Sequence, residues 1–106
     1  MLTIGTNDLR ILRLIIQDNE VFYARYVMKI IRKALAHDQD TIQVFETEDG
    51  SVKGILTRNT YRSAIQECVE VFVRYEEFEF AHEAMQVKDA VEVFMLLTEA
   101  VTTPHT

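Results

Sequence analysis

The chain has 106 residues, of which 48% are hydrophobic and 26% charged, and this composition is typical of one globular domain. Its apolar runs are only a few residues long, which excludes a membrane-spanning helix, and its net charge of −6 argues against a dedicated nucleic-acid binder. A single cysteine, Cys68, excludes an internal disulfide, and the N-terminus lacks the basic and apolar regions of a secretory signal. We expect a cytoplasmic protein with one domain over residues 1–101 and a disordered tail over residues 102–106.

The two halves of the chain carry opposite charge. Residues 1–37 contain six basic side chains against three acidic ones, whereas residues 59–106 contain three basic against nine acidic. The halves can therefore attract each other within one fold, or present two different faces to partners.

Two helices are predicted before residue 40. The first follows a cap at Thr6 or Asn7, and its apolar positions are Leu9, Leu12 and Ile16, widened by Ile11 and Ile15. The polar cluster at residues 17–20 interrupts this stripe, and a second helix then continues to about Ala36. A single helix is the alternative, because no glycine or proline separates the segments. We favour two helices, since roughly 31 residues in one helix would measure about 46 Å.

A β-hairpin is predicted over residues 41–57. Asp49 and Gly50 both tolerate the positive φ that a type I′ turn requires at its two central positions. A two-residue turn there produces an ion pair, an aromatic ring over a glycine and a β-branched pair, namely Glu46 with Lys53, Phe45 with Gly54 and Val44 with Ile55.

Both faces of this hairpin are partly apolar. One face carries Phe45, Val52 and Leu56, and the other carries Ile42, Val44 and Ile55. A lone two-stranded hairpin is marginally stable in water. We therefore expect the hairpin to pack on the helices or at a dimer interface, and the protein to form a homo-oligomer such as a homodimer.

Two more helices are predicted after the hairpin. The third begins at Asn59 or Thr60, and its apolar stripe is Tyr61, Ile65, Cys68, Phe72 and Tyr75. Valines alternate over residues 69–75, so a strand is the alternative there, although the helical pattern extends further. The chain is expected to turn between Phe78 and Gln86, because one helix to Val101 would measure about 65 Å. The predicted fold is thus α+β and mostly helical, in the order helix, helix, hairpin, helix, helix.

The sequence contains no recognisable catalytic or metal motif. The segment from His82 to Gln86 begins like the helix motif of metalloproteases but lacks its second histidine. Cys68 lies on an apolar stripe between two glutamates, which favours a buried thiol over a nucleophile. We expect no enzymatic activity, no metal and no cofactor.

One group of cations suggests nucleic-acid binding. Steps of four, three and one place these residues along one face of the second helix, namely Arg25, Lys29, Arg32 and Lys33. A basic helix followed by a hairpin resembles the order of a winged-helix DNA reader. The acidic hairpin tip, Glu48 and Asp49, would repel phosphate, so we hold nucleic-acid binding as the alternative function.

The first hypothesis is binding to another protein. Aromatic residues stand among glutamates near the predicted turn between the last two helices, where they either cap the core or anchor an interface. The interface candidates are Phe45, Tyr75, Phe78, Phe80, Glu76, Glu77 and Glu79. We expect a non-catalytic adaptor, inhibitor or regulator that presents an apolar and acidic surface to a protein partner.

Overall fold

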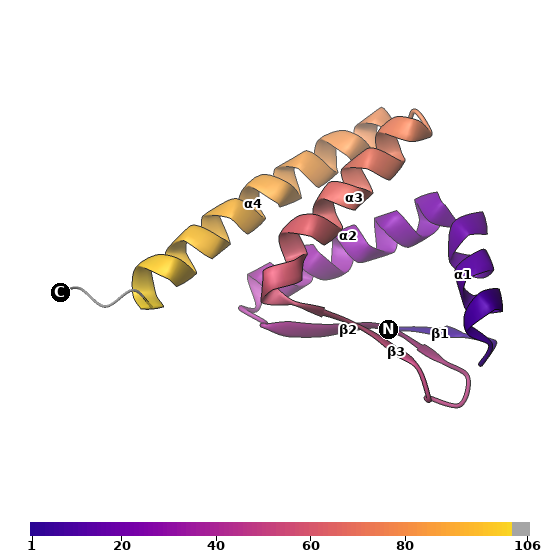
Figure 1. The fold of residues 1–106 in the computed structure, drawn as a ribbon. Coiled ribbons are helices and arrows are strands. Elements are labelled where there is room, and N and C mark those ends of the chain that lie inside the picture. Colours follow the sequence, from indigo (N-terminus) through magenta and orange to yellow (C-terminus); the bar gives the residue numbers. More distant parts are fainter. Residues whose placement is uncertain (103–106) are drawn as a thin grey trace.

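Figure 1 shows the computed structural model of the chain, which describes residues 1–102 and the side chains of residues 1–97. A small sheet lies on one side of a layer of helices. The elements in order are β1 (Leu2–Ile4), α1 (Leu9–Asp18), α2 (Glu20–Ala36), β2 (Thr41–Thr47), β3 (Lys53–Thr57), a 3-10 turn (Arg58–Thr60), α3 (Tyr61–Arg74) and α4 (Phe78–Thr102). The predicted class, α+β and mostly helical, is confirmed, and so is the order of the helices and the hairpin. Residues 103–106 of the predicted tail lie outside the described part.

The sheet contains one strand that the sequence did not predict. Its order is β1-β2-β3, with β1 parallel to β2 and β3 antiparallel to β2. In the parallel pair Leu2 lies opposite Phe45 and Ile4 opposite Thr47. Three residues are too few to show an alternating pattern, so β1 is defined by its pairing with β2.

A β-bulge changes the predicted hairpin register. The pairs of Glu46 with Lys53 and of Phe45 with Gly54 are confirmed, but Gln43 and not Val44 lies opposite Ile55. The irregularity falls between Gln43 and Phe45, and beyond it the register of β2 is shifted by one residue.

The shift sorts the apolar residues of the hairpin. Ile42 now lies opposite Leu56, on the face that packs against the helices, whereas Ile55 points outward and is 55% exposed. Val44, on the bulge, is 2% exposed. The predicted two-sided apolar hairpin is therefore wrong, and the hairpin by itself no longer requires a second copy of the chain.

The tight turn of the hairpin begins earlier than predicted. The N–H of Gly50 donates to the Thr47 carbonyl at 2.9 Å, and Gly50 has φ 73° whereas Asp49 does not adopt a positive φ. A type I′ turn at Asp49-Gly50 is therefore wrong. The Asp49 carboxylate instead accepts a hydrogen bond from the Ser51 N–H at 2.9 Å, and bonds to Ser51 lower the pKa of this carboxyl.

The first two helices are separate, as predicted, with Asn19 between them. The cap of α1 is Asp8, whose carboxylate accepts from the Arg10 N–H at 2.8 Å. The predicted caps at Thr6 and Asn7 are wrong. Asn7 Oδ1 instead accepts from the Asp49 N–H at 3.0 Å and joins the N-terminal segment to the hairpin loop.

The predicted helix is confirmed for residues 69–74, which belong to α3, and the strand alternative is wrong. The following turn lies at residues 75–77 and not within residues 78–86, which are helical. The sequence contains no glycine here, and the turn is made by Glu76 in the left-handed conformation at φ 58°. Asp38 at φ 51° ends α2 in the same way, with Gln39 N–H donating to the Ala34 carbonyl at 2.9 Å.

The core lies between the sheet and the helices α2, α3 and α4. Its largest fully buried apolar side chains are Met28, Ile31, Tyr61, Ile65, Phe72 and Val91. The Tyr61 hydroxyl donates to the Gln39 carbonyl at 2.8 Å, so this buried phenol is paired. Cys68 is also buried, as predicted, and burial raises the pKa of its thiol to about 12. Among the described residues no helix is both long and apolar enough to cross a membrane.

Candidate interaction surface

The turn between α3 and α4 brings together six of the seven predicted interface residues. Five of them form what we call the acidic corner: Tyr75, Glu76, Glu77, Phe78 and Glu79. All five are exposed, and the two aromatic side chains are strongly so, at 50% for Tyr75 and 63% for Phe78. Large apolar side chains that remain exposed between charged neighbours are typical of anchors at protein interfaces.

Backbone hydrogen bonds fix the shape of the acidic corner. The N–H of Glu76 donates to the Val73 carbonyl at 3.1 Å, and that of Glu77 donates to the Phe72 carbonyl at 2.8 Å. This pair of bonds is the Schellman motif that closes many helices. The Glu77 carbonyl then accepts from the Ala81 N–H at 2.9 Å as α4 begins. The corner is thus a tight connection with a backbone fixed by hydrogen bonds.

Phe80, the sixth candidate, belongs to the core. Its ring lies 5.6 Å from that of Phe72 at an interplanar angle of 47°, and the Arg25 guanidinium stands 4.3 Å from its centroid. The aromatic residues at the turn therefore divide between both predicted roles: Phe80 caps the core, whereas Tyr75 and Phe78 face outward. Phe45, the seventh candidate, lies on β2 away from the corner and covers Gly54.

The acidic corner carries excess negative charge. Arg74, the neighbouring cation, is paired with Glu20 of α2 at 3.0 Å. A hydrogen bond to the same Glu20 carboxylate, together with its negative charge, raises the pKa of the Tyr75 hydroxyl. Since Glu20 already compensates Arg74, the corner's own glutamates remain available to attract a cationic partner.

The four cations of the nucleic-acid alternative lie on α2, but two of them face α4. Arg25 stands over Phe80, and Arg32 forms an ion pair with Glu83 at 3.6 Å. Lys29 and Lys33 are exposed. A helix that packs against α4 on this side offers only part of its basic face to a DNA groove, and this function stays a prediction with less support than the first.

A second exposed surface lies on α1, and the sequence did not predict it. Only Leu12 of this helix is buried, whereas Leu9, Ile11, Leu14 and Ile15 are 36% to 56% exposed. Ile11 and Ile15 were expected to widen the buried stripe. The sequence did contain a sign of this exposure. The apolar residues of α1 cover a wider arc of the helix surface than one contact with α2 can bury.

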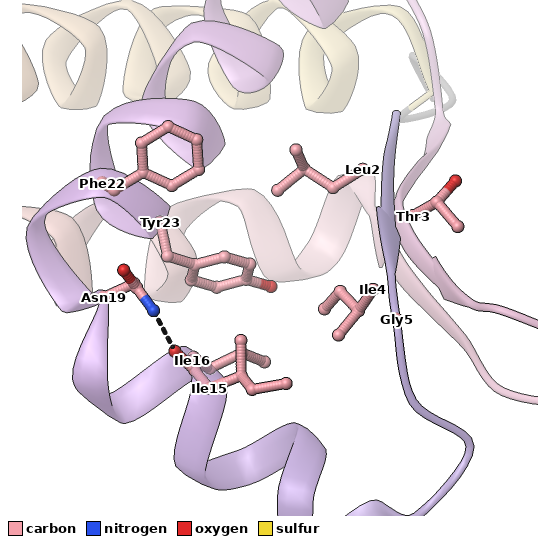
Figure 2. A pocket seen from close by; sticks show the side chains of 9 residues that line it. All are labelled: Leu2, Thr3, Ile4, Gly5, Ile15, Ile16, Asn19, Phe22 and Tyr23. Carbon is pink, nitrogen blue, oxygen red and sulfur yellow. Dashed lines mark hydrogen bonds between the residues drawn. The ribbon is translucent and has the colours of Figure 1, made fainter.

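An apolar groove adjoins this surface. Figure 2 shows it between β1 and the α1–α2 junction, with Leu2 and Ile4 on one side and Ile15, Phe22 and Tyr23 on the other. The groove has a volume of about 380 Å³. Burial raises the pKa of the Tyr23 hydroxyl to about 12.

The part of the chain that the structure describes places no three His, Cys, Asp or Glu side chains where they could hold a metal ion together. Comparisons with protein-family models, with curated proteins and with solved structures gave no match. Function therefore has to be inferred from the geometry and charge of the exposed surfaces.

Proposed function

We propose that this protein is a non-catalytic interaction protein that binds a basic protein partner at its acidic corner. The observation that carries this proposal is the presence of two exposed aromatic rings, Tyr75 and Phe78, among three exposed glutamates on the tight turn and the first residues of α4. An adaptor, an inhibitor or a regulator would each work through such a surface.

The chemistry of the corner defines the partner. Aromatic anchors gain most of their binding energy when they enter an apolar pocket that excludes water. Surrounding carboxylates accelerate association with a cationic surface and disfavour acidic competitors. The partner should therefore combine a pocket for an aromatic ring with lysine or arginine residues at its rim. The fixed backbone of the corner lowers the entropy that is lost on binding.

The conformation of Glu76 supports a functional role. A left-handed residue at the end of a helix is usually glycine, because a side chain there costs about 1 kcal/mol or more. Glu76 adopts φ 58° and stays exposed. Its conformation therefore lowers the stability of the fold, and its side chain adds no contact to the core. Local departures of this kind concentrate at functional sites.

Charge reversal tests the proposal. The triple variant Glu76→Lys, Glu77→Lys, Glu79→Lys moves the formal net charge from −6 to 0. The control Glu48→Lys, Glu67→Lys, Glu70→Lys makes the same change at exposed positions outside the corner. Tagged proteins are used to capture partners from a lysate of the cells that express the chain, in low and high salt.

We expect the wild type and the control to retain the same bound protein, and the corner variant to lose it. Retention by the wild type should weaken as salt screens the carboxylates. Equal retention of the partner by the corner variant would contradict the proposal. A partner that is lost only in the control variant would contradict it too.

A further inference from the structure

The exposed face of α1 has the form of a helix–helix contact. Ile11, Leu14 and Ile15 occur at the spacing i, i+3, i+4, which places them side by side on one face of the helix. We call these three residues the α1 stripe. They are 47%, 56% and 36% exposed, and α1 lies at the periphery of the molecule, away from α3 and α4 (Figure 1). No described element of the chain covers this face.

Charges at the two ends of α1 indicate what covers the stripe. Arg10, near the start of the helix, contacts the Asp8 carboxylate at 3.5 Å but keeps a side chain that is 91% exposed, and Asp18, the last residue of the helix, is also exposed. Asp18 lies one turn beyond Leu14 on the same face. An exposed guanidinium thus lies beside one end of the stripe and an exposed carboxylate at the other, although Asp8 shares the guanidinium within the same chain.

This arrangement is complementary to itself. In an antiparallel pair of α1 helices centred on Leu14, Arg10 of each copy lies next to Asp18 of the other, and the two stripes face each other. A parallel pair would instead place Arg10 beside Arg10 and Asp18 beside Asp18. A two-fold axis perpendicular to the two helices produces the antiparallel order and closes the assembly at two copies.

From this complementarity we propose that the occupant of the α1 stripe is a second copy of the chain, in an antiparallel two-fold dimer. The proposal concerns a different surface from the acidic corner and does not depend on it. A standard stable interface buries about 800 Å² on each partner, which one short helix does not supply. The neighbouring groove adds area, because Ile15 belongs to both surfaces and the rim residue Phe22 is 60% exposed.

The oligomeric state tests the proposal. Sedimentation velocity of the full chain between about 1 and 100 µM should show a monomer–dimer equilibrium. Leu14→Glu should weaken dimerisation by about a hundredfold or more, because the two-fold axis places two carboxylates against each other in an apolar contact. Leu96→Glu is the control, because Leu96 on α4 is 63% exposed and lies outside the stripe.

Charge exchange tests the antiparallel order. Arg10→Asp and Asp18→Arg should each weaken dimerisation by about tenfold, since each creates two like-charge pairs, and the double variant should restore it. Arg10→Asp adds a negative charge at the start of α1 and Asp18→Arg adds a positive charge at its end, and the helix dipole favours both changes. A weaker dimer in these variants would therefore not result from unfolding of α1. Circular dichroism of every variant verifies this.

Three results would overturn the proposal. The first is a monomer over the whole concentration range. The second is a dimer that survives Leu14→Glu but dissociates in Leu96→Glu, which would place the contact on α4. The third is a double charge variant no better than either single variant, which would exclude antiparallel pairing of α1.

Discussion

Replacing Glu76 with glycine should make the protein more stable, although it removes a side chain from the proposed binding surface. Glu76 occupies the left-handed region at φ 58°, where glycine meets no steric penalty. The matched control is Glu79→Gly, which removes the same charge from the same surface. Glu79 lies in the first turn of α4, so its backbone is helical and not left-handed.

The two changes should have opposite signs. A left-handed conformation costs an L-residue about 1–2 kcal/mol, whereas glycine gives the unfolded chain extra freedom that costs roughly 0.5–1 kcal/mol. Glu76→Gly should therefore raise the free energy of unfolding by about 0.5–1 kcal/mol. Glu79→Gly should lower it by about 1 kcal/mol, through lost helix propensity and lost interaction with the helix dipole.

Urea unfolding followed by far-ultraviolet circular dichroism measures both effects. If the free energy of unfolding falls with urea concentration at the same slope in all variants and only the midpoints shift, stability alone has changed. A loss of stability in Glu76→Gly similar to that in Glu79→Gly would refute the left-handed turn. Partner binding should fall in both variants, so Glu76→Gly separates a binding defect from a folding defect.

Two further predictions concern the hairpin and the buried titratable groups. Gly54→Ala should lower the free energy of unfolding by about 1–3 kcal/mol, because a Cβ there would collide with the Phe45 ring. Gly5→Ala, whose Cβ meets nothing within 4 Å, is the control, and an equal effect of both changes would contradict the packing of Phe45 on Gly54. Burial raises the pKa of Cys68 from 9.0 and that of Tyr23 from 10.0, each to about 12. The folded state thus favours the protonated groups, so the contribution of these two groups to stability should be constant below about pH 8, and stability should fall as the pH rises from 9 toward 12. Urea midpoints across this range give the profile; Cys68→Ala should flatten its first part, and an unchanged profile would show that the thiol is not responsible.

The strongly periodic parts of the chain were predictable from the sequence. The apolar spacing in α2 and α3 is regular enough to place both helices, and Phe45 was expected to cover Gly54, as it does. These features depend on local pattern and on one cross-strand neighbour, and both can be read from adjacent residues.

Other features depend on tertiary contacts or on unusual local geometry. Strand β1 exists because β2 pairs with it, and the bulge between Gln43 and Phe45 has no signature in the residue types. The turns at Asp38 and Glu76 lack the glycine that usually marks a left-handed residue. The α1 stripe is exposed because only a small part of α1 contacts the rest of the molecule. The spacing of apolar residues in the sequence does not show how much of a helix is covered.

Photo-cross-linking from the acidic corner tests the central proposal most directly. A photoreactive phenylalanine analogue replaces Phe78 in one protein and Leu96 in another, because both side chains are 63% exposed. Irradiation in a lysate of the expressing cells should join position 78 to one basic protein, and high salt should diminish the product. Cross-linking from position 96 alone, or equal cross-linking from both positions, would contradict the acidic corner as the site where this protein binds its partner.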